Sequence, residues 1–339
     1  MTSDPTFRAA WWLPGAHAQT LWGKFGRGDP GVLTRMEQWP SRDGDLLDVL
    51  RLDGPNGSPR LVILHGLEGT LASHYVRSSF HEASRRGWRA TLLLFRGCSG
   101  RINRAPRLYH SGETSDLDDV VQTLRREEPG APIVLAGFSL GGNVLLKWLG
   151  EQGDQAPPEV VAAAAVSAPY DLARGSRHLE RGFARLYARA FLKSLKAKAA
   201  AKCAQHPDLP VRLVDALASR TLWEFDDRMT APMHGFRDAT DYYTRSSSLG
   251  FLHSVRRPSL LLSAVDDPFL PPAVLDEVRV IATGNAELHV EFPEHGGHVG
   301  FVSGVRAREP FYYAEWRVVS FLAMQLARRP DPLVAGTPH

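Results

Sequence analysis

The sequence has very little cysteine, with only Cys98 and Cys203 among 339 residues. Two cysteines cannot form the several cross-links of a disulfide-stapled domain or supply a cysteine-rich zinc site. The sequence also lacks an apolar run near the roughly 20 residues that span a bilayer. It shows no basic stretch followed by the long apolar core of a secretion signal. These absences favour a protein of a reducing compartment, so we predict a cytoplasmic location and no integral membrane segment.

An excess of one charge is missing too. The 40 lysines and arginines are interspersed with 37 aspartates and glutamates, and the formal net charge is only +3. Such a balance argues against nucleic acid as a partner. The pattern contains no metal-ligand cluster and no phosphate-cradling loop, so we predict no metal and no cofactor. A composition of 43% hydrophobic and 23% charged residues is typical of a globular domain.

The most informative stretch that is present lies at residues 133–149. An apolar run of strand character meets the motif Gly-Phe-Ser-Leu-Gly at 137–141, and a helix-like run follows at once. Strand, sharp turn and helix are the context of a nucleophile elbow, in which the serine is exposed at the tip of the turn. We therefore predict Ser139 as the nucleophile and the N–H of Leu140 as one oxyanion-hole donor.

Apolar runs of strand length recur along the chain and alternate with helix-like segments. They lie at residues 61–64, 91–94, 160–166 and 260–264. Strands that are apolar throughout are typical of a parallel sheet buried on both faces. Together with the elbow, this alternation predicts an α/β-hydrolase fold with a mostly parallel, doubly wound sheet.

Two later loops supply the remaining chemistry. A pair of aspartates, Asp266 and Asp267, follows the strand at 260–264, and His298 follows a double glycine after the last strand. Serine, acid and histidine in that order are characteristic of α/β-hydrolases. A serine hydroxyl needs a histidine to take its proton and a carboxylate to orient that histidine.

Each of these loops contains a competing residue. We favour His298 over His295 because the double glycine lets the loop fold toward the elbow. We favour Asp267 over Asp266 because Pro268 pushes the preceding residue into an extended conformation that can aim its side chain outward. The reverse assignment of the two aspartates stays open at this point.

The loop His-Gly-Leu-Glu-Gly at 65–69 directly follows an early strand. A loop in this position commonly provides the second oxyanion donor, and we assign that role to the N–H of Leu67. His65 is interpreted as a structural histidine that holds the loop. Cys98 and Ser99 lie in a tight loop without an elbow around them and are interpreted as structural.

The chain is divided as follows. We predict an irregular aromatic arm over 1–40, a core formed by 41–171 and 251–328, a helical cap insertion over 172–250, and a tail over 329–339. The arm is expected to pack its aromatic side chains on the core, with contact to the substrate site as the alternative.

A basic face is predicted on the longest cap helix. It consists of Lys193, Lys196, Lys198 and Lys202. Such a face is usually solvated, but it leaves peripheral membrane contact open.

Six segments together resemble one branch of the α/β-hydrolases, often called the embryogenesis-associated or YheT-like family. They are PGAHAQTL at 14–21, HGLEG at 65–69, FRGCSG at 95–100, GFSLGGN at 137–143, DDPF at 266–269 and GGHVGF at 296–301. The resemblance spans nearly the whole domain. It implies a Ser-Asp-His charge relay and hydrolysis of carboxylic esters, with phospholipid cleavage in some animal members.

The leading hypothesis is a cofactor-independent serine esterase acting on short- to medium-chain acyl esters through an acyl-enzyme. Its substrate would be a small-molecule ester or a lipid. Acyl transfer and phospholipase or lipase activity would use the same residues and remain alternatives. A non-catalytic binding protein on the same scaffold is an alternative of another class. The sequence leaves the oligomeric state open.

Overall fold

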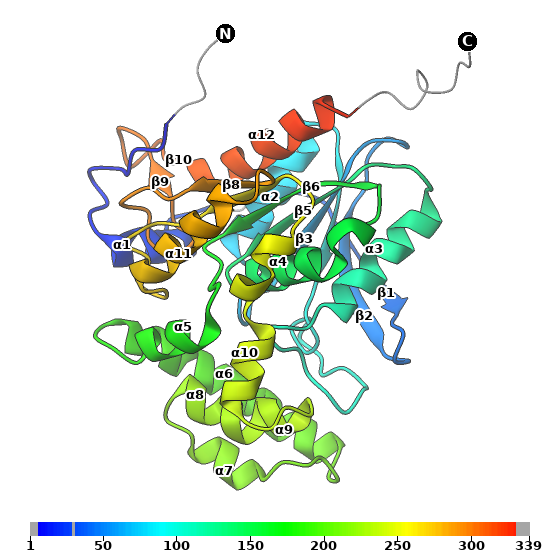
Figure 1. Cartoon of the computed structure of the whole chain (residues 1–339), viewed down its shortest axis with the longest axis vertical. Coiled ribbons are helices and arrows are strands. Elements are labelled where there is room, and N and C mark those ends of the chain that lie inside the picture. Colours follow the sequence, from blue (N-terminus) through cyan, green and yellow to red (C-terminus); the bar gives the residue numbers. More distant parts are fainter. Residues whose placement is uncertain (1–5, 29–30, 330–339) are drawn as a thin grey trace.

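A computed structural model describes residues 6–28 and 31–329, and its centre is a mixed eight-stranded sheet (Figure 1). In sheet order the strands are β1 (Arg35–Pro40), β2 (Leu46–Leu52), β4 (Arg89–Leu93), β3 (Arg60–Leu64), β5 (Ile133–Phe138), β6 (Val160–Val166), β7 (Ser259–Leu262) and β8 (Leu288–Glu291). β1 and β2 pair antiparallel, as do β2 and β4, and every pair from β4 to β8 is parallel. The predicted α/β fold with a mostly parallel sheet is confirmed.

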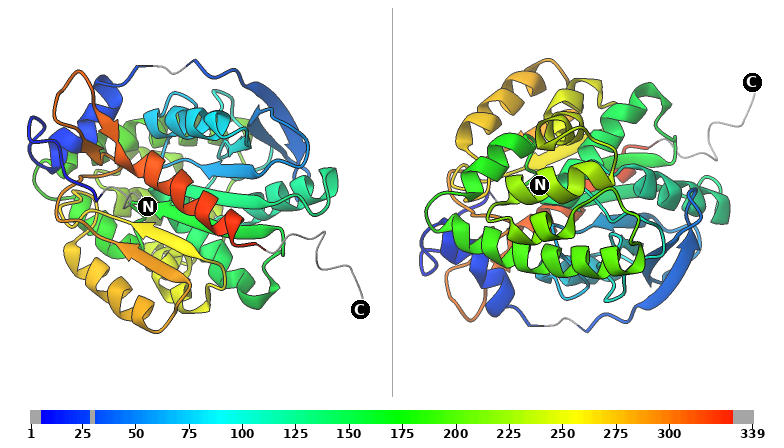
Figure 2. Two further views of the ribbon diagram at one scale, coloured as in Figure 1. Left: turned by 90° about the horizontal axis from the view of Figure 1, so that it is seen from above. Right: turned by 90° about the horizontal axis from the view of Figure 1, so that it is seen from below.

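Helices cover both faces of the sheet because alternate residues of each strand point to opposite sides. In β3, Val62 and Leu64 belong to one core cluster, whereas Leu61 and Ile63 belong to the other. The first cluster is completed by α3 (Ser115–Glu127), α4 (Leu140–Gln152) and α11 (Pro272–Thr283). The second is completed by α2 (His74–Arg85) and α12 (Tyr313–Ala327), the latter crossing the sheet in the left panel of Figure 2.

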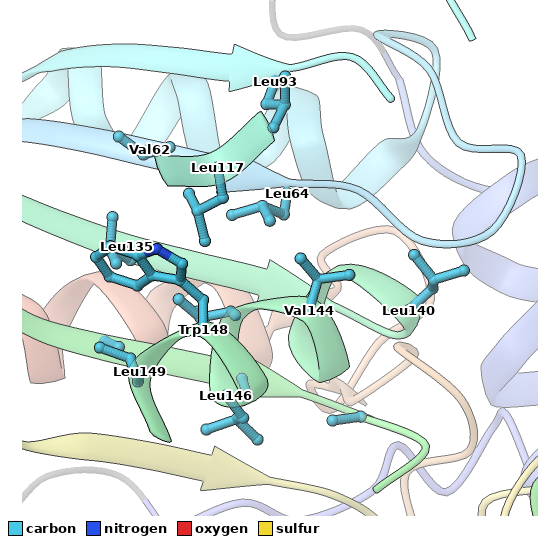
Figure 3. Close-up of a cluster of buried hydrophobic side chains, with 14 of the residues drawn as sticks. Val62, Leu64, Leu93, Leu117, Leu135, Leu140, Val144, Leu146, Trp148 and Leu149 are labelled. Carbon is cyan, nitrogen blue, oxygen red and sulfur yellow. The ribbon is translucent and has the colours of Figure 1, made fainter. Parts of the chain in front are cut away.

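The helix that follows the predicted elbow is packed tightly onto the central strands. Figure 3 shows Trp148 of α4 next to Leu135 of β5, with Val144 of α4 and with Val62 and Leu64 of β3 in the same cluster. All five side chains are at most 1% exposed. Burial of one such side chain contributes roughly 1.5–3 kcal/mol, so the start of α4 is held firmly against the sheet.

Between β6 and β7 the chain forms only helices. They are α5 (Leu172–Leu179), α6 (Ala184–Gln205), α7 (Leu213–Ala218), α8 (Leu222–Phe225), the π-helix η2 (Asp226–Thr230), α9 (Ala231–Met233), α10 (Ala239–Ser246) and the 3-10 segment η3 (Ser248–Ser254). In Figure 1 the helices α6 to α10 gather on one side of the sheet domain. We call residues 172–250 the helical insertion. Its role as a cap remains a prediction at this point.

The predicted irregular arm over 1–40 is wrong in two places. Residues Ala16–Phe25 form helix α1, and Arg35–Pro40 form the edge strand β1 of the main sheet. The sequence pattern did not predict β1 because most of its side chains are exposed, so the strand lacks the alternation of apolar and polar residues that marks a half-buried strand. α1 contacts a distant loop through its backbone and through the polar side chains of Gln19 and Thr20, and such contacts leave no apolar period in the sequence. The predicted tail lies largely outside the described residues.

The predicted basic face on α6 is also wrong in part. Lys193 is exposed, but Lys198 forms an ion pair with Glu68 at 2.7 Å, and Lys202 is fully buried. The Lys202 ammonium donates to the carbonyl of Asn103 at 2.6 Å, and burial lowers the pKa of Lys202 to about 8. The reason is helical geometry, because Lys198 lies five residues after Lys193 and therefore on another side of the helix.

Shorter elements complete the chain. The 3-10 turn η1 (Gly153–Gln155) follows α4, and the strands β9 (Val302–Ser303) and β10 (Phe311–Tyr312) form a small antiparallel pair before α12. Within the described residues, no helix combines the length and the apolar character that crossing a bilayer would require.

Candidate active site

Ser139 lies at the tip of the turn between β5 and α4. Its backbone has φ 53° and ψ −123°, a left-handed conformation that non-glycine residues rarely adopt. The turn can be this tight because Gly141 has no side chain. A Cβ atom at Gly141 would lie 2.4 Å from the carbonyl oxygen of Leu64 in β3. The first turn of α4 therefore sits directly against the sheet, and Ser139 faces the cavity described below.

The structure brings Ser139, His298 and Asp267 together in one hydrogen-bonded chain. The Nε2 atom of His298 lies 2.8 Å from Ser139 Oγ, and its Nδ1 atom lies 2.9 Å from Asp267 Oδ2. The serine follows β5, the aspartate follows β7 and the histidine follows β8. The carboxyl ends of parallel strands share one edge of the sheet. Ser139 and His298 can therefore be in contact although they are 159 residues apart in the sequence.

Asp267 and His298 are held on several sides. They are 4% and 9% exposed. The N–H of Phe269 donates to Asp267 Oδ1 at 2.8 Å, and the Phe269 ring stacks on the His298 imidazole with centroids 4.0 Å apart. These contacts fix both the carboxylate and the plane of the histidine ring.

The competing residues occupy different positions. Asp266 accepts a hydrogen bond from the N–H of Gly297 at 2.9 Å, so it shapes the loop that carries His298. His295 lies beside Asp266 at 3.3 Å with its side chain 72% exposed, and it does not line the cavity at Ser139. Within the described chain, Asp267 rather than Asp266 is therefore the carboxylate in contact with His298.

Helix α1 braces the His298 loop, a role that was missed from the sequence. Thr20 Oγ1 accepts a hydrogen bond from the N–H of His298 at 2.9 Å, and the side chain of Gln19 bonds both backbone groups of Val302. A Cβ atom at Gly297 would lie 2.4 Å from the carbonyl oxygen of Ala16. The segment at 14–21 is thus a support for the site, and none of its residues lines the cavity.

Ser167 was also missed. Its hydroxyl accepts from the N–H of Val299 at 3.0 Å, and its own backbone is left-handed at φ 51°. It directly follows β6 and contacts the residue next to His298, which α1 supports through Thr20. The only signal in the sequence was its position directly after an apolar strand.

Two backbone N–H groups lie near the serine without an acceptor. Within the described residues, neither the N–H of Leu67 nor that of Leu140 donates a hydrogen bond. Both residues line the cavity with Ser139, and a Cβ atom at Gly66 would lie 3.1 Å from Ser139 Cβ. The loop at 65–69 therefore runs alongside the serine, and two free donors beside a serine Oγ are what an oxyanion hole requires.

His65 and Cys98 are held as structural residues. The buried His65 ring contacts the carbonyl oxygen of Gly66 at 2.7 Å and accepts from the N–H of Phe95 at 3.1 Å. Burial lowers the pKa of His65 to about 4, so the ring is neutral. Burial raises the pKa of the Cys98 thiol to about 11, which removes the thiolate that a cysteine nucleophile needs.

One cavity connects the sheet edge with the helical insertion. Ser139, His298, Leu67 and Leu140 line it from the sheet side. The insertion contributes mostly apolar and aromatic side chains, namely Leu172, Leu179, Phe191, Leu195, Leu222, Tyr242 and Tyr243. The helical insertion therefore forms one wall of the space in front of Ser139.

The fold and this site together define an α/β hydrolase. Residues 59–305 match the family described as "alpha/beta hydrolase fold", and the chain belongs to that family. Within it, the chain belongs to the YheT-like branch. It is 39% identical to YheT of Escherichia coli, which is named as a candidate esterase, over 91% of both chains. It is 31% identical to "Phospholipase ABHD3" of Mus musculus, over 91% of this chain and 76% of that protein.

A more distant relative and a solved structure extend this picture. "Monoacylglycerol lipase" of Saccharomyces cerevisiae is 30% identical over 79% of this chain and 60% of its own length. The Pyrococcus furiosus esterase Pf2001 superposes with a TM-score of 0.57 at 17% identity, covering 87% of this chain and 92% of that one. At this identity the superposition supports the fold alone.

Proposed function

We propose that this protein is a serine hydrolase that cleaves carboxylic esters through Ser139, His298 and Asp267. The observation that carries the proposal is the continuous contact from Asp267 through His298 to Ser139, with distances of 2.9 and 2.8 Å. The two free N–H groups of Leu67 and Leu140 beside the serine add the second requirement of acyl transfer.

In the proposed reaction, His298 takes the proton of Ser139 as Oγ attacks the ester carbonyl carbon. The carbonyl oxygen becomes an oxyanion that accepts hydrogen bonds from the N–H groups of Leu67 and Leu140. Protonated His298 then gives its proton to the leaving alcohol as the C–O bond breaks, which leaves an acyl-enzyme. A water molecule then gives a proton to His298 and attacks the acyl carbonyl carbon. His298 returns that proton to Ser139 Oγ as the bond between the acyl carbon and Oγ breaks, which releases the acid and restores the free serine.

Asp267 has a supporting part in this sequence. With a proton on Nδ1, His298 donates to Asp267, and its Nε2 atom is then free to accept from Ser139. The carboxylate stabilises the imidazolium that forms and does not itself take the proton.

The apolar lining of the cavity supports short- to medium-chain acyl esters as substrates, because such a surface binds alkyl chains by excluding water. The helical insertion over 172–250 would then act as a cap that limits access and keeps water out. Phospholipase or lipase activity, and acyl transfer to an alcohol, would use the same residues and differ in the group that enters the cavity or accepts the acyl group.

The test is covalent labelling with a fluorophosphonate probe, which reacts with activated serines. The wild-type protein is expected to be labelled, and Ser139→Ala should abolish labelling while thermal unfolding shows an intact fold. Ser99→Ala is the matched control and should be labelled as strongly as the wild type. Undiminished labelling of Ser139→Ala would refute the assignment, and absence of labelling in the wild type would favour a non-catalytic binding protein.

The outer side of the insertion supports peripheral membrane contact as an additional property. A groove there, which we call the basic groove, has five basic residues and one acid, Glu180, in its lining; the basic ones are Arg185, Arg189, Lys193, Lys196 and Arg220. Within the described residues, none of these five forms an ion pair with an acid, although most other arginines of the chain do. The occupant that we propose is the anionic surface of a lipid bilayer. Phe183 and Leu186 are exposed at the start of α6, the helix that carries Arg185 and Arg189.

We further propose a cytoplasmic location. Both cysteines, Cys98 and Cys203, are free thiols, as suits a reducing compartment.

A further inference from the structure

One ionisable side chain stands out in the cavity wall that the helical insertion provides. Asp226 of the insertion lines the same cavity as Ser139 and His298. It begins the π-helix η2, a wide helical turn that is rare and is found frequently at functional sites.

The carboxylate of Asp226 is held by two hydroxyl groups. Thr230 Oγ1 donates to Oδ1 at 2.6 Å, and the hydroxyl of Tyr243 donates to Oδ2 at 2.6 Å. Two hydrogen bonds fix the orientation of the group, but an ionised carboxylate can accept about four. Asp226 therefore keeps acceptor capacity, and its position in the lining directs that capacity to the cavity.

No cation compensates this group. Within the described residues, Asp226 forms no ion pair with a lysine, arginine or histidine, and its interacting neighbours are the two hydroxyls. Burial raises the pKa of Asp226 to about 6, so most copies are ionised at neutral pH. A buried charge that has hydroxyl donors but no ion-pair partner is costly, and an apolar residue at this position would avoid that cost.

The surroundings restrict what a partner for Asp226 could be. The aromatic rings of Tyr242 and Tyr243 lie side by side in the lining with centroids 5.0 Å apart. Leucine is the commonest of the other lining residues, and the polar ones include His110, Ser111, Ser176 and Thr230. A ligand that extends from Ser139 to Asp226 therefore lies along a mostly apolar lining, and Asp226 is the carboxylate that the helical insertion adds to it. An apolar lining that leads to a carboxylate suits a ligand made of a chain of methylene groups that ends in a hydrogen-bond donor.

We infer that the preferred substrate carries a hydrogen-bond donor, an amine or a hydroxyl, at a distance from the ester carbonyl, and that Asp226 accepts this donor. The inference rests on the proposed esterase function, because it takes the cavity to be the place where the substrate chain binds. A protonated amine would form an ion pair and a hydroxyl a charge-assisted hydrogen bond, both stronger than neutral hydrogen bonds.

The kinetic test uses p-nitrophenyl alkanoates of several chain lengths, each as a plain, an ω-hydroxy and an ω-amino ester. At the chain length that reaches Asp226, wild-type kcat/KM should be roughly 10- to 100-fold higher for a donor-tailed ester than for the plain one. Asp226→Leu should reverse this preference. Asp226→Asn should still prefer the ω-hydroxy ester over the plain ester but should no longer prefer the ω-amino ester. Because asparagine has the same shape as aspartate, this variant is expected to keep the fold.

Asp208→Asn is the matched control, because Asp208 is an exposed aspartate of the same insertion. It should leave every ratio unchanged. A preference for only one of the two tails would identify the donor as an alcohol or as an amine. Equal kcat/KM for plain and donor-tailed esters at all chain lengths, or a preference that survives in Asp226→Leu, would overturn the inference.

A binding experiment tests this inference independently of the proposed reaction. In Ser139→Ala the same intact esters should bind, and calorimetry should give a lower Kd for the donor-tailed ester, a difference that is lost on adding Asp226→Leu. If the wild type hydrolyses none of the esters while this difference is measured, the reaction is wrong and the Asp226 site stands. If the fluorophosphonate probe labels Ser139 but the plain and donor-tailed esters bind with equal Kd, the proposed reaction stands and the Asp226 site is wrong.

Discussion

At the scale of single residues, strained backbone conformations gather around the proposed nucleophile. Ser139, Ser167, Val299 and Phe301 all have positive φ values between 45° and 56° without being glycine. Such conformations cost of order 1–3 kcal/mol each and persist where surrounding contacts enforce them. Here those contacts come from the first turn of α4 and from the hydrogen bond between Ser167 and Val299. These contacts therefore hold Ser139 and the His298 loop in one arrangement despite the cost of the strained backbone.

The two neighbouring aspartates allow a sharp test of roles at this scale. Asp267→Asn is expected to lower kcat by about 10⁴, because an asparagine favours the wrong histidine tautomer. Asp266→Asn should leave kcat within a few-fold and should lower stability by about 1–3 kcal/mol, since it weakens the bond to the Gly297 N–H. Steady-state kinetics and urea unfolding measure the two effects.

Each aspartate variant serves as the control for the other, because both replace one carboxylate by an amide in the same turn. If Asp266→Asn stops turnover in a folded protein while Asp267→Asn stays active, the orienting role belongs to Asp266.

At the scale of elements, the longest helix of the insertion is tied to the oxyanion loop. Glu68, next to Leu67, accepts from Lys198 of α6 at 2.7 Å and from the Tyr109 hydroxyl at 2.7 Å. The same Tyr109 oxygen accepts from the N–H of Glu68 at 3.0 Å, which helps to keep Glu68 in its left-handed conformation at φ 57°. The ion pair therefore lets α6 influence where the neighbouring Leu67 N–H points.

We predict that Lys198→Met lowers kcat roughly 10-fold with a smaller change in KM. Loss of a whole oxyanion donor costs 10²–10³ in kcat, and a misdirected donor should cost less. Glu68→Gln should give a similar loss, and the double variant should be no worse than either single one, because both remove the same contact.

Lys193→Met on the exposed side of α6 is the control and should be silent in this kinetic assay. Strictly additive losses in the double variant, or a change confined to KM, would mean that the pair does not position the oxyanion loop.

At the scale of the whole molecule, charge is distributed unevenly although the formal net charge is only +3. Many arginines of the sheet domain are neutralised in ion pairs, for example Arg96 with Asp45 at 2.8 Å and Arg60 with Glu128 at 2.9 Å. Among the described residues, the five cations of the basic groove form no such ion pair, and they outnumber the one acid of its lining, Glu180. A nearly neutral protein can therefore present a locally cationic face.

Sedimentation with vesicles tests that face. Binding is expected with vesicles that contain anionic lipid, not with purely zwitterionic ones, and it should weaken as salt rises. The double variant Arg189→Gln and Lys193→Gln should weaken binding roughly 10- to 30-fold, at about 1 kcal/mol per basic residue. Arg85→Gln with Arg279→Gln removes the same charge elsewhere and should have little effect. Equal losses from both pairs would mean that net charge, rather than the groove, is responsible.

The sequence by itself determined the features that depend on residues close together in the chain. The buried strands, the elbow around Ser139 and the order of serine, acid and histidine are local patterns, because backbone geometry and side-chain periodicity act over a few residues. The tertiary structure alone decided which of Asp266 and Asp267 contacts His298, that α1 supports the His298 loop, and that Lys198 and Lys202 point inward. It also decided that Asp226 faces the cavity. These outcomes rest on contacts between segments about 30 to 280 residues apart, and nothing in the local sequence encodes which distant backbone group a side chain will meet.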